Sequence, residues 1–177
     1  PSASITTDAG VLRCGDGRGM NGAVMKNFVK PDALFASALV GEGAAFVSEV
    51  DESDGSIAMF RPKIAVLNNV SLDHKSMDEL RALFGGFIGH AETAVLNLDN
   101  DETAVLASAR KGGKLAYSLN DKSADLFAEN IEPQPFGVSF DVVAKGESAR
   151  VTLKMPGRHN VSNALAAIAA ASACGVS

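Results

Sequence analysis

The stretch KIAVLNNVSLDHKSMDELRALFGGFI, residues 63 to 88, decides the fold class. It opens with the apolar run Lys63 to Asn68, which has the length of a buried strand. From Met77 to Ile88, apolar residues recur three and four positions apart, which predicts an amphipathic helix with Ser76 as its N-cap. A buried strand followed by an amphipathic helix is the repeating unit of α/β proteins. The stretch therefore predicts a layered α/β fold.

The segments on either side continue this pattern. The expected elements are buried strands at 44–50, 93–97 and 114–119, a helix at 101–110, and alternating strands at 137–143 and 149–154 with a turn at Gly146. After the segment Met155 to Asn160, an alanine-rich run to Ala173 predicts a helix that ends near Gly175. The alternating strands are typical of an antiparallel edge. We expect a three-layer sandwich with a mainly parallel central sheet and a small antiparallel extension, and we assign no element to residues 1–20.

Composition limits the class of protein. With 177 residues and 46% hydrophobic content, the chain has the size of one domain, residues 1–177. Its net charge of −5 and its pI near 5.2 argue against nucleic-acid and anionic-membrane partners. Cys14 and Cys174 lack metal-type spacing, and neither a secretion signal nor a membrane-length apolar run occurs. We expect a cytoplasmic protein.

An acidic segment, SEVDESDGS at 48–56, directly follows one predicted strand. Ligands of α/β sheets bind at the carboxyl ends of strands, where this segment lies. Its carboxylates are the oxygen ligands that Mg²⁺ takes in proteins, and they belong to Glu49, Asp51, Glu52 and Asp54. A solvated acidic turn is the alternative interpretation for such a cluster.

A second polar loop, Asn68 to His74, follows the strand at 63–68. His74 is a candidate metal ligand, and Asp73 is placed to fix the tautomer of its ring. A lone loop histidine is more often a surface residue. Two loops at the same edge can share one ion, so the acidic segment strengthens the metal interpretation.

The third polar feature is Gly157-Arg-His-Asn160 with Asn163, at the start of the alanine-rich helix. Asn160 and Asn163 lie three positions apart, on one helix face. Their amides both donate and accept hydrogen bonds, which suits the edge of an adenine ring. A helix cap with a packed alanine face is the alternative.

Four segments, in their order along the chain, resemble the central ATP-binding domain of the Mur ligase family. They are SEVDESDGS at 48–56, VLNNVSLDH at 66–74, LNLDN at 96–100 and MPGRHNVSNALAAIAAA at 155–171. The resemblance covers residues 20 to 177. The EVDESD sequence and the segment Asn21 to Phe28 are most similar to the branch of UDP-N-acetylmuramate:L-alanine ligase and murein peptide ligase.

The resemblance implies an ATP- and Mg²⁺-dependent ligase of peptidoglycan precursor synthesis. In this family ATP phosphorylates an acceptor carboxylate, and an amino group then attacks the acyl phosphate to form an amide. Glu49 and His74 match the family's Mg²⁺-binding positions, and Asn69 lies in the loop near the acyl phosphate. Asn160 and Asn163 match the asparagines that contact adenine. The implied partners are a UDP-N-acetylmuramate-type acceptor and an amino acid or peptide.

The sequence also departs from the family pattern. Family members carry a GxxGK[ST] phosphate loop, which does not occur in residues 1–177. Thr6 and Thr7 resemble the threonines that follow the lysine of that loop, so they are candidate nucleotide contacts. The family's UDP-sugar-binding and amino-acid-binding domains have no counterpart in these residues. We therefore expect the 177 residues alone to be inactive in ligation.

Two other interpretations stay open. Folylpolyglutamate synthase uses the same chemistry, although the DESD and GRHN segments argue against it. A non-catalytic nucleotide-sensing or scaffold domain that lacks the phosphate loop is the alternative from another class.

Overall fold

The fold is described by a computed structural model for residues 9–14, 45–50, 52, 55–72 and 75–176. One sheet contains eight strands in the order β2-β1-β3-β4-β5-β6-β7-β8. The strands are β1 (Ala9–Cys14), β2 (Ala45–Glu49), β3 (Ile64–Leu67), β4 (Thr93–Asn97), β5 (Gly113–Ser118), β6 (Leu126–Gln134), β7 (Gly137–Ala144) and β8 (Glu147–Leu153). The helices are α1 (Met77–Gly89), α2 (Asp101–Ala109) and α3 (Arg158–Ala173), with a short 3₁₀ helix η1 (Ser56–Met59).

The centre of the sheet is parallel. Strands β3, β4, β5 and β6 pair in parallel, while β6, β7 and β8 form the predicted antiparallel extension. At the other edge β1 pairs antiparallel with both β2 and β3, so β2 and β3 run in the same direction. The carboxyl ends of β2, β3, β4 and β5 therefore lie at one end of the sheet.

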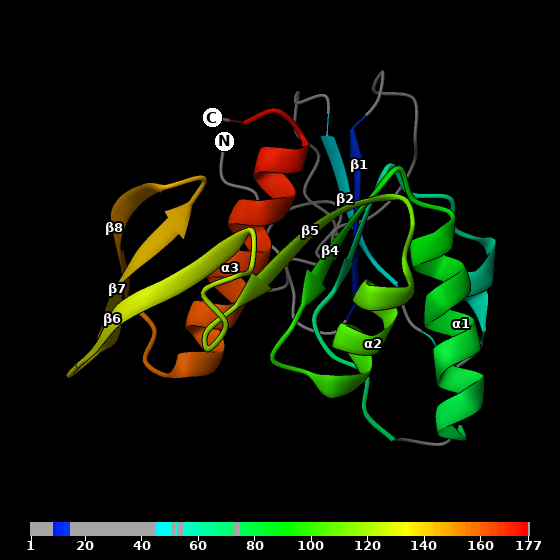
Figure 1. The fold of residues 1–177 in the computed structure, drawn as a ribbon, viewed down its shortest axis with the longest axis horizontal. Helices are drawn as coiled ribbons and strands as arrows, with labels where there is room; N and C mark the ends of the chain where they lie inside the picture. The colour runs from blue at the N-terminus through cyan, green and yellow to red at the C-terminus, as the bar shows by residue number, and fades with distance from the viewer. Residues whose placement is uncertain (1–8, 15–44, 51, 53–54, 73–74, 177) are drawn as a thin grey trace, which may run out of the picture.

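Helices cover both faces of the sheet (Figure 1). One core lies between the sheet and helices α1 and α2, and it includes Leu67 and Phe87. A second core lies between the sheet and α3, and it includes Val66 and Leu165. Neighbouring residues of β3 thus enter different cores, as successive side chains of a strand must. The expected three-layer α/β sandwich is confirmed.

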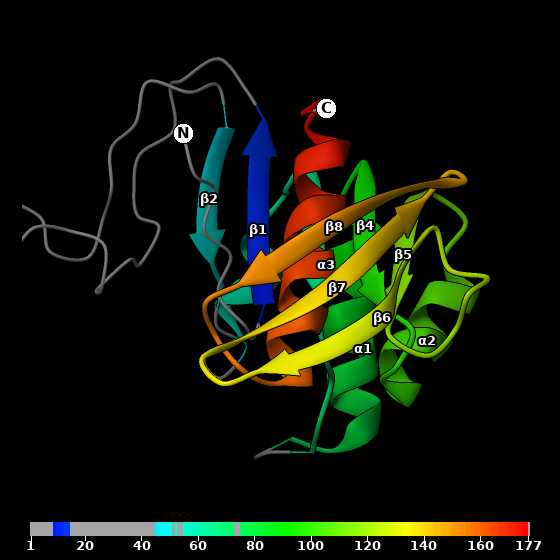
Figure 2. The same cartoon turned by 90° about the vertical axis from the view of Figure 1, so that its left-hand side faces the viewer.

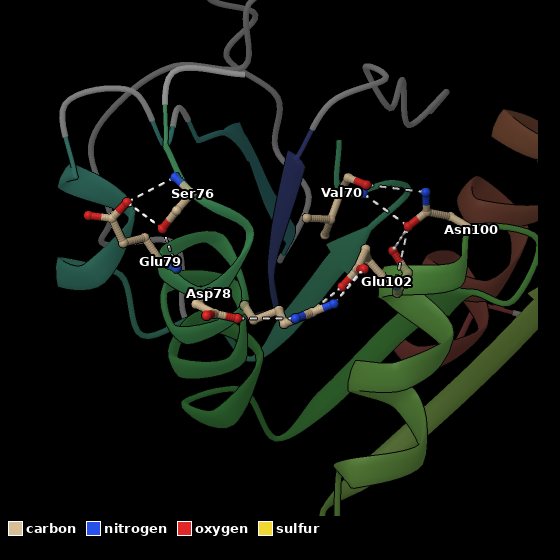
Figure 3. Close-up of polar contacts among 8 residues, drawn as sticks. Val70, Ser76, Asp78, Glu79, Asn100 and Glu102 are labelled. Carbon is tan, nitrogen blue, oxygen red and sulfur yellow. Dashed lines mark hydrogen bonds and ion pairs between the residues drawn. The ribbon is translucent and has the colours of Figure 1, made fainter. Parts of the chain in front are cut away.

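Helix α1 begins where the sequence predicts. The Ser76 hydroxyl accepts a hydrogen bond from the Glu79 backbone N–H at 3.3 Å, and the Ser76 N–H donates to the Glu79 carboxylate at 2.9 Å (Figure 3). This reciprocal pair is a capping box, which satisfies backbone donors that have no partner inside the helix.

Helix α3 is held closely against the sheet by small residues. Ala166, Ala169 and Ala170 are fully buried, which allows the helix backbone to approach the strands. The helix ends as predicted near Gly175, whose φ of 83° is in the left-handed region. There the Val176 N–H donates to the Ala171 carbonyl at 3.0 Å, which satisfies a terminal acceptor.

Strands β6, β7 and β8 lie side by side at one edge, next to α3 (Figure 2). The sequence does not predict β6, because its alternation is interrupted. The register with β7 shifts between Glu129 and Glu132, and Asn130 has a φ of 50°. Such a bulge removes the period-two pattern that identifies a strand. Among the described residues, no helix combines the length and apolar character needed to cross a bilayer.

Candidate functional site

The loop after β3 is fixed by side chains from the two neighbouring strands. The Asn97 amide, at the end of β4, donates to the Asn68 backbone carbonyl at 2.9 Å. The Tyr117 hydroxyl, near the end of β5, donates to the Asn68 side-chain oxygen, also at 2.9 Å. Asn68, Asn97 and Tyr117 are all buried. The next residue, Asn69, is exposed. The hydrogen bonds of Asn68 hold Asn69 at the carboxyl edge of the sheet.

Asn100 holds the same loop one residue further on (Figure 3). Its side-chain oxygen accepts from the Val70 N–H at 3.1 Å, and its amide donates to the Val70 carbonyl at 3.3 Å. The same oxygen accepts from the Thr103 N–H at 3.0 Å and so caps α2. One asparagine therefore joins the loop after β3 to the first turn of α2.

Asp99 organises the loop after β5. Its carboxylate accepts from the Ser118 hydroxyl at 2.5 Å, the Leu119 N–H at 2.6 Å and the Asn120 amide at 2.8 Å. The Asn120 side-chain oxygen in turn accepts from the Arg158 guanidinium at 3.4 Å. Because Arg158 is the first residue of α3, this chain of contacts places the start of α3 at the same edge of the sheet as the loops after β3 and β4.

The first turn of α3 depends on Gly157. This residue has a φ of 104°, a backbone conformation that residues with a side chain rarely adopt, so a larger residue is disfavoured there. The Asn160 amide donates to the Pro156 carbonyl at 2.7 Å and ties the helix start to the preceding turn. Asn160 and Asn163 are both half-buried, one turn apart. The predicted packed alanine face is also present, whereas the N-cap position itself, Gly157, makes no side-chain cap.

Glu49 ends β2 and has an exposed side chain. It is in register with Gly10 of β1, which is in register with Val66 of β3. Glu49 lies two residues after Val47, and residues two apart on a strand point to the same face of the sheet. Because Val47 packs in the core beneath α3, Glu49 lies on the α3 side of the sheet. Glu49 is thus at the correct edge and on the side of the sheet that carries Asn160 and Asn163.

Helix η1 follows the acidic segment. The Gly55 N–H donates to the Glu52 carbonyl at 3.1 Å, and Gly55, with a φ of 77°, precedes η1. Val50 and Ile57 are buried in the core that includes α1. Val50, which follows β2, and Ile57 of η1 therefore pack in the same core.

Several predicted site residues lie outside the described residues, so the structure does not test them. They are His74 and Asp73 in the second loop, Asp51 and Asp54 in the acidic segment, and Thr6 and Thr7. Within the part of the chain that the structure describes, no three His, Cys, Asp or Glu side chains gather as a metal site. Glu49 supplies a solvent-accessible carboxylate at the expected edge, which fits Mg²⁺ in donor type. The pairing of Glu49 with His74 stays a prediction.

The surroundings of the Tyr117 hydroxyl strongly shift its pKa. Burial raises its pKa far above the ordinary tyrosine value, a hydrogen bond with Ser162 opposes this rise, and the charge of Asp99 adds to it. Tyr117 is therefore a neutral hydrogen-bond donor at every physiological pH.

The fold and this edge define an α/β domain that presents polar loops to a ligand at the carboxyl ends of its parallel strands. Residues 18–171 match the model of the Mur ligase middle domain. The chain therefore belongs to the Mur ligase family, in its middle domain.

Individual relatives agree with this assignment. The chain is 39% identical over 141 residues to the UDP-N-acetylmuramate–L-alanine ligase of Acaryochloris marina, which covers 75% of this chain and 29% of that protein. It also resembles the structure of the UDP-N-acetylmuramate-alanine ligase of Thermotoga maritima, with a TM-score of 0.63 and 25% identity over 73% of this chain and 30% of that one. The chain thus spans less than a third of the length of these relatives.

The folylpolyglutamate synthetase of Lactobacillus casei is a more distant structural neighbour. It has a TM-score of 0.50 and 18% identity over 65% of this chain and 29% of that one, which shows a shared fold alone. The sequence relatives are UDP-N-acetylmuramate–L-alanine ligases, so they favour the Mur ligase interpretation over folylpolyglutamate synthase.

Sequence reasoning missed the residues that connect the motifs. The LNLDN segment is identified as a motif, but no role follows for Asn97, Asp99 or Asn100. Tyr117 gives no signal beyond being the single tyrosine of the chain. Their partners lie 19 to 49 residues away in sequence, and spacing alone cannot reveal such contacts.

Proposed function

We propose that this chain is the Mg-ATP-binding central domain of a ligase that joins an amino acid or peptide to a UDP-N-acetylmuramate-type acceptor in peptidoglycan precursor synthesis. The observation that supports this most directly is the hydrogen-bonded edge of the sheet. Two of the four motif segments, 66–74 and 96–100, are joined there by direct hydrogen bonds, and Asn120 connects Asp99 of the second to Arg158 in segment 155–171. A cytoplasmic location, where ATP is available, is part of the proposal.

Each motif has a separate task in this proposal. Asn160 and Asn163 contact the adenine edge, since amides match its donors and acceptors. Glu49 and His74 hold Mg²⁺, which supplies electrostatic stabilisation of the charge that develops during phosphoryl transfer. Asn69 orients the acceptor near the acyl phosphate. The preformed loops contribute by positioning, because the described buried side-chain polar atoms already have hydrogen-bond partners.

Substitution of the two metal-site residues tests this function. In a complete ligase that carries this domain, Glu49→Ala or His74→Ala is expected to lower kcat roughly 100-fold, the scale of losing one electrostatic contact to the transition state. The melting temperature is expected to stay close to that of the wild type, because Glu49 is exposed.

Matched controls are available within the chain. Glu147→Ala and His90→Ala remove the same groups from other exposed positions and are expected to leave kcat unchanged. Wild-type turnover in both Glu49→Ala and His74→Ala would overturn the metal assignment.

A further inference from the structure

Tyr117 lies between the two halves of the proposed site. Its ring is fully buried in the core beneath α3, together with Val161 and Leu165. Its hydroxyl donates to the Asn68 side chain at the end of β3, at 2.9 Å and away from solvent. One side chain therefore contacts both the helix on one side of the sheet and the loop at its edge.

Both contacts lead to residues that carry the proposed function. Asn68 directly precedes Asn69, which the proposed function assigns to the acyl phosphate. Helix α3 carries Asn160 and Asn163, which the proposed function assigns to the adenine. Ser162 lies between these two asparagines and is a hydrogen-bond partner of the Tyr117 hydroxyl. Tyr117 thus connects the adenine half of the site with the phosphoryl-transfer half.

The other hydrogen-bonded connection between these halves, within the described residues, is weaker. It runs through Arg158 and Asn120, and that contact is 3.4 Å long and exposed to solvent. Water competes for an exposed contact, whereas a buried hydrogen bond loses its full value when one partner is removed. The Tyr117 hydroxyl is therefore the stronger constraint on the distance between loop and helix.

We propose that Tyr117 is a positioning residue that holds the loop bearing Asn69 at a fixed distance from the nucleotide-binding end of α3. The inference rests on the proposed function, because it assigns the two ends of the nucleotide to these elements. When the two halves separate, ATP still binds through α3, but its terminal phosphate is misaligned with the acceptor. Loss of the hydroxyl therefore slows the chemical step more than it weakens nucleotide binding.

The first test is Tyr117→Phe in a complete ligase that carries this domain, because phenylalanine keeps the ring and removes only the hydroxyl. We expect kcat to fall about tenfold, since small misplacements of reacting groups cost one to two orders of magnitude, while KM for ATP changes by less than about twofold. Ser139→Ala is the matched control. It removes a buried hydroxyl that contacts Thr152 in the antiparallel extension and is expected to leave both constants unchanged.

The second test needs no ligand. In amide NMR spectra of the 177-residue chain, Ser162→Ala is expected to shift the signals of Asn69 and Val70, because the change is transmitted through Tyr117. In a Tyr117→Phe background the same substitution is expected to leave those two signals unmoved. Equal shifts in both backgrounds would overturn the connection.

The outcomes separate the two claims. If Glu49→Ala slows turnover and Tyr117→Phe does not, the positioning role is wrong and the proposed function stands. If Glu49→Ala and His74→Ala both leave turnover intact, the metal assignment within the proposed function is wrong. A fall in kcat for Ser139→Ala equal to that for Tyr117→Phe would show a general effect of lost stability and would also overturn the positioning role.

Discussion

The carboxyl edge of the parallel strands and the antiparallel extension both contain networks of polar side chains, but they are built differently. At the carboxyl edge the contacts between loops join residues 19 to 49 positions apart, such as Asp99 with Ser118 and Tyr117 with Asn68. In the extension they join neighbouring strands, such as Arg150 with Asp141, nine positions apart.

Burial separates the two networks further. Asn68, Asn97 and Tyr117 are buried, whereas Arg150 of β8 forms exposed ion pairs with Asp141 of β7 and Glu132 of β6. Exposed ion pairs contribute little to stability, while buried hydrogen-bonded networks fix one geometry. The comparison indicates that the carboxyl edge is organised to hold loops for a ligand, and that the extension mainly completes the core beneath α3.

The largest effect on stability is expected for Asn97→Ala. The substitution leaves the Asn68 carbonyl without its buried donor and removes the contact of the Asn97 side-chain oxygen with the Asp99 N–H. We expect the free energy of unfolding to fall by about 2 kcal/mol, the cost of an unsatisfied buried group. Chemical denaturation of the chain measures this, and a loss no larger than that of an exposed substitution would remove the distinction between the two networks.

A smaller effect is expected for Ser139→Ala in the extension. Its hydroxyl and the Thr152 hydroxyl lie 2.9 Å apart, and the exposed Thr152 retains access to water after the change. We expect a loss of about 1 kcal/mol in the free energy of unfolding, typical of one hydrogen bond. Nucleotide affinity is expected to stay unchanged, and a weakened affinity would indicate that the extension takes part in the site.

The smallest effect concerns the ion pair of Arg81 with Glu102, which joins α1 to α2 at 2.6 Å (Figure 3). The hydrogen bond from Arg81 lowers the pKa of Glu102 in the folded state. Its contribution to stability is therefore fully present above the unfolded glutamate pKa of about 4.3 and is lost as pH falls through the lower pKa of the folded state. Glu102→Gln should reduce stability slightly at pH 7 and by less at pH 3. An equal loss at both values would show that charge is not the cause.

Local patterns in the sequence account for much of the fold. The helical spacing of apolar residues and the capping residue Ser76 predict α1 where it is observed. The apolar run at residues 93–97 likewise predicts β4 with its observed bounds. Strand β6 escapes prediction because a bulge breaks its alternation, and β1 lies in a segment without a regular pattern. Motif order identifies Asn69, Asn160, Asn163 and Glu49 as candidates at one edge, and their elements do end or begin there.

The sequence could not predict how these motifs are held together. The contacts of Asn97, Asn100 and Tyr117 depend on which strands are neighbours in the sheet, and this order is a property of the whole fold. A single tyrosine in an apolar strand has the same local pattern whether its hydroxyl meets solvent or a buried asparagine.

The most direct test of the central claim is a calorimetric titration of the 177-residue chain with Mg-ATP. The account predicts measurable binding with a micromolar dissociation constant, weakened about tenfold by Asn163→Ala, as expected for the loss of one to two hydrogen bonds to adenine. Absence of binding, or equal affinity in the wild type and Asn163→Ala, would contradict a nucleotide site at this edge and favour a scaffold domain.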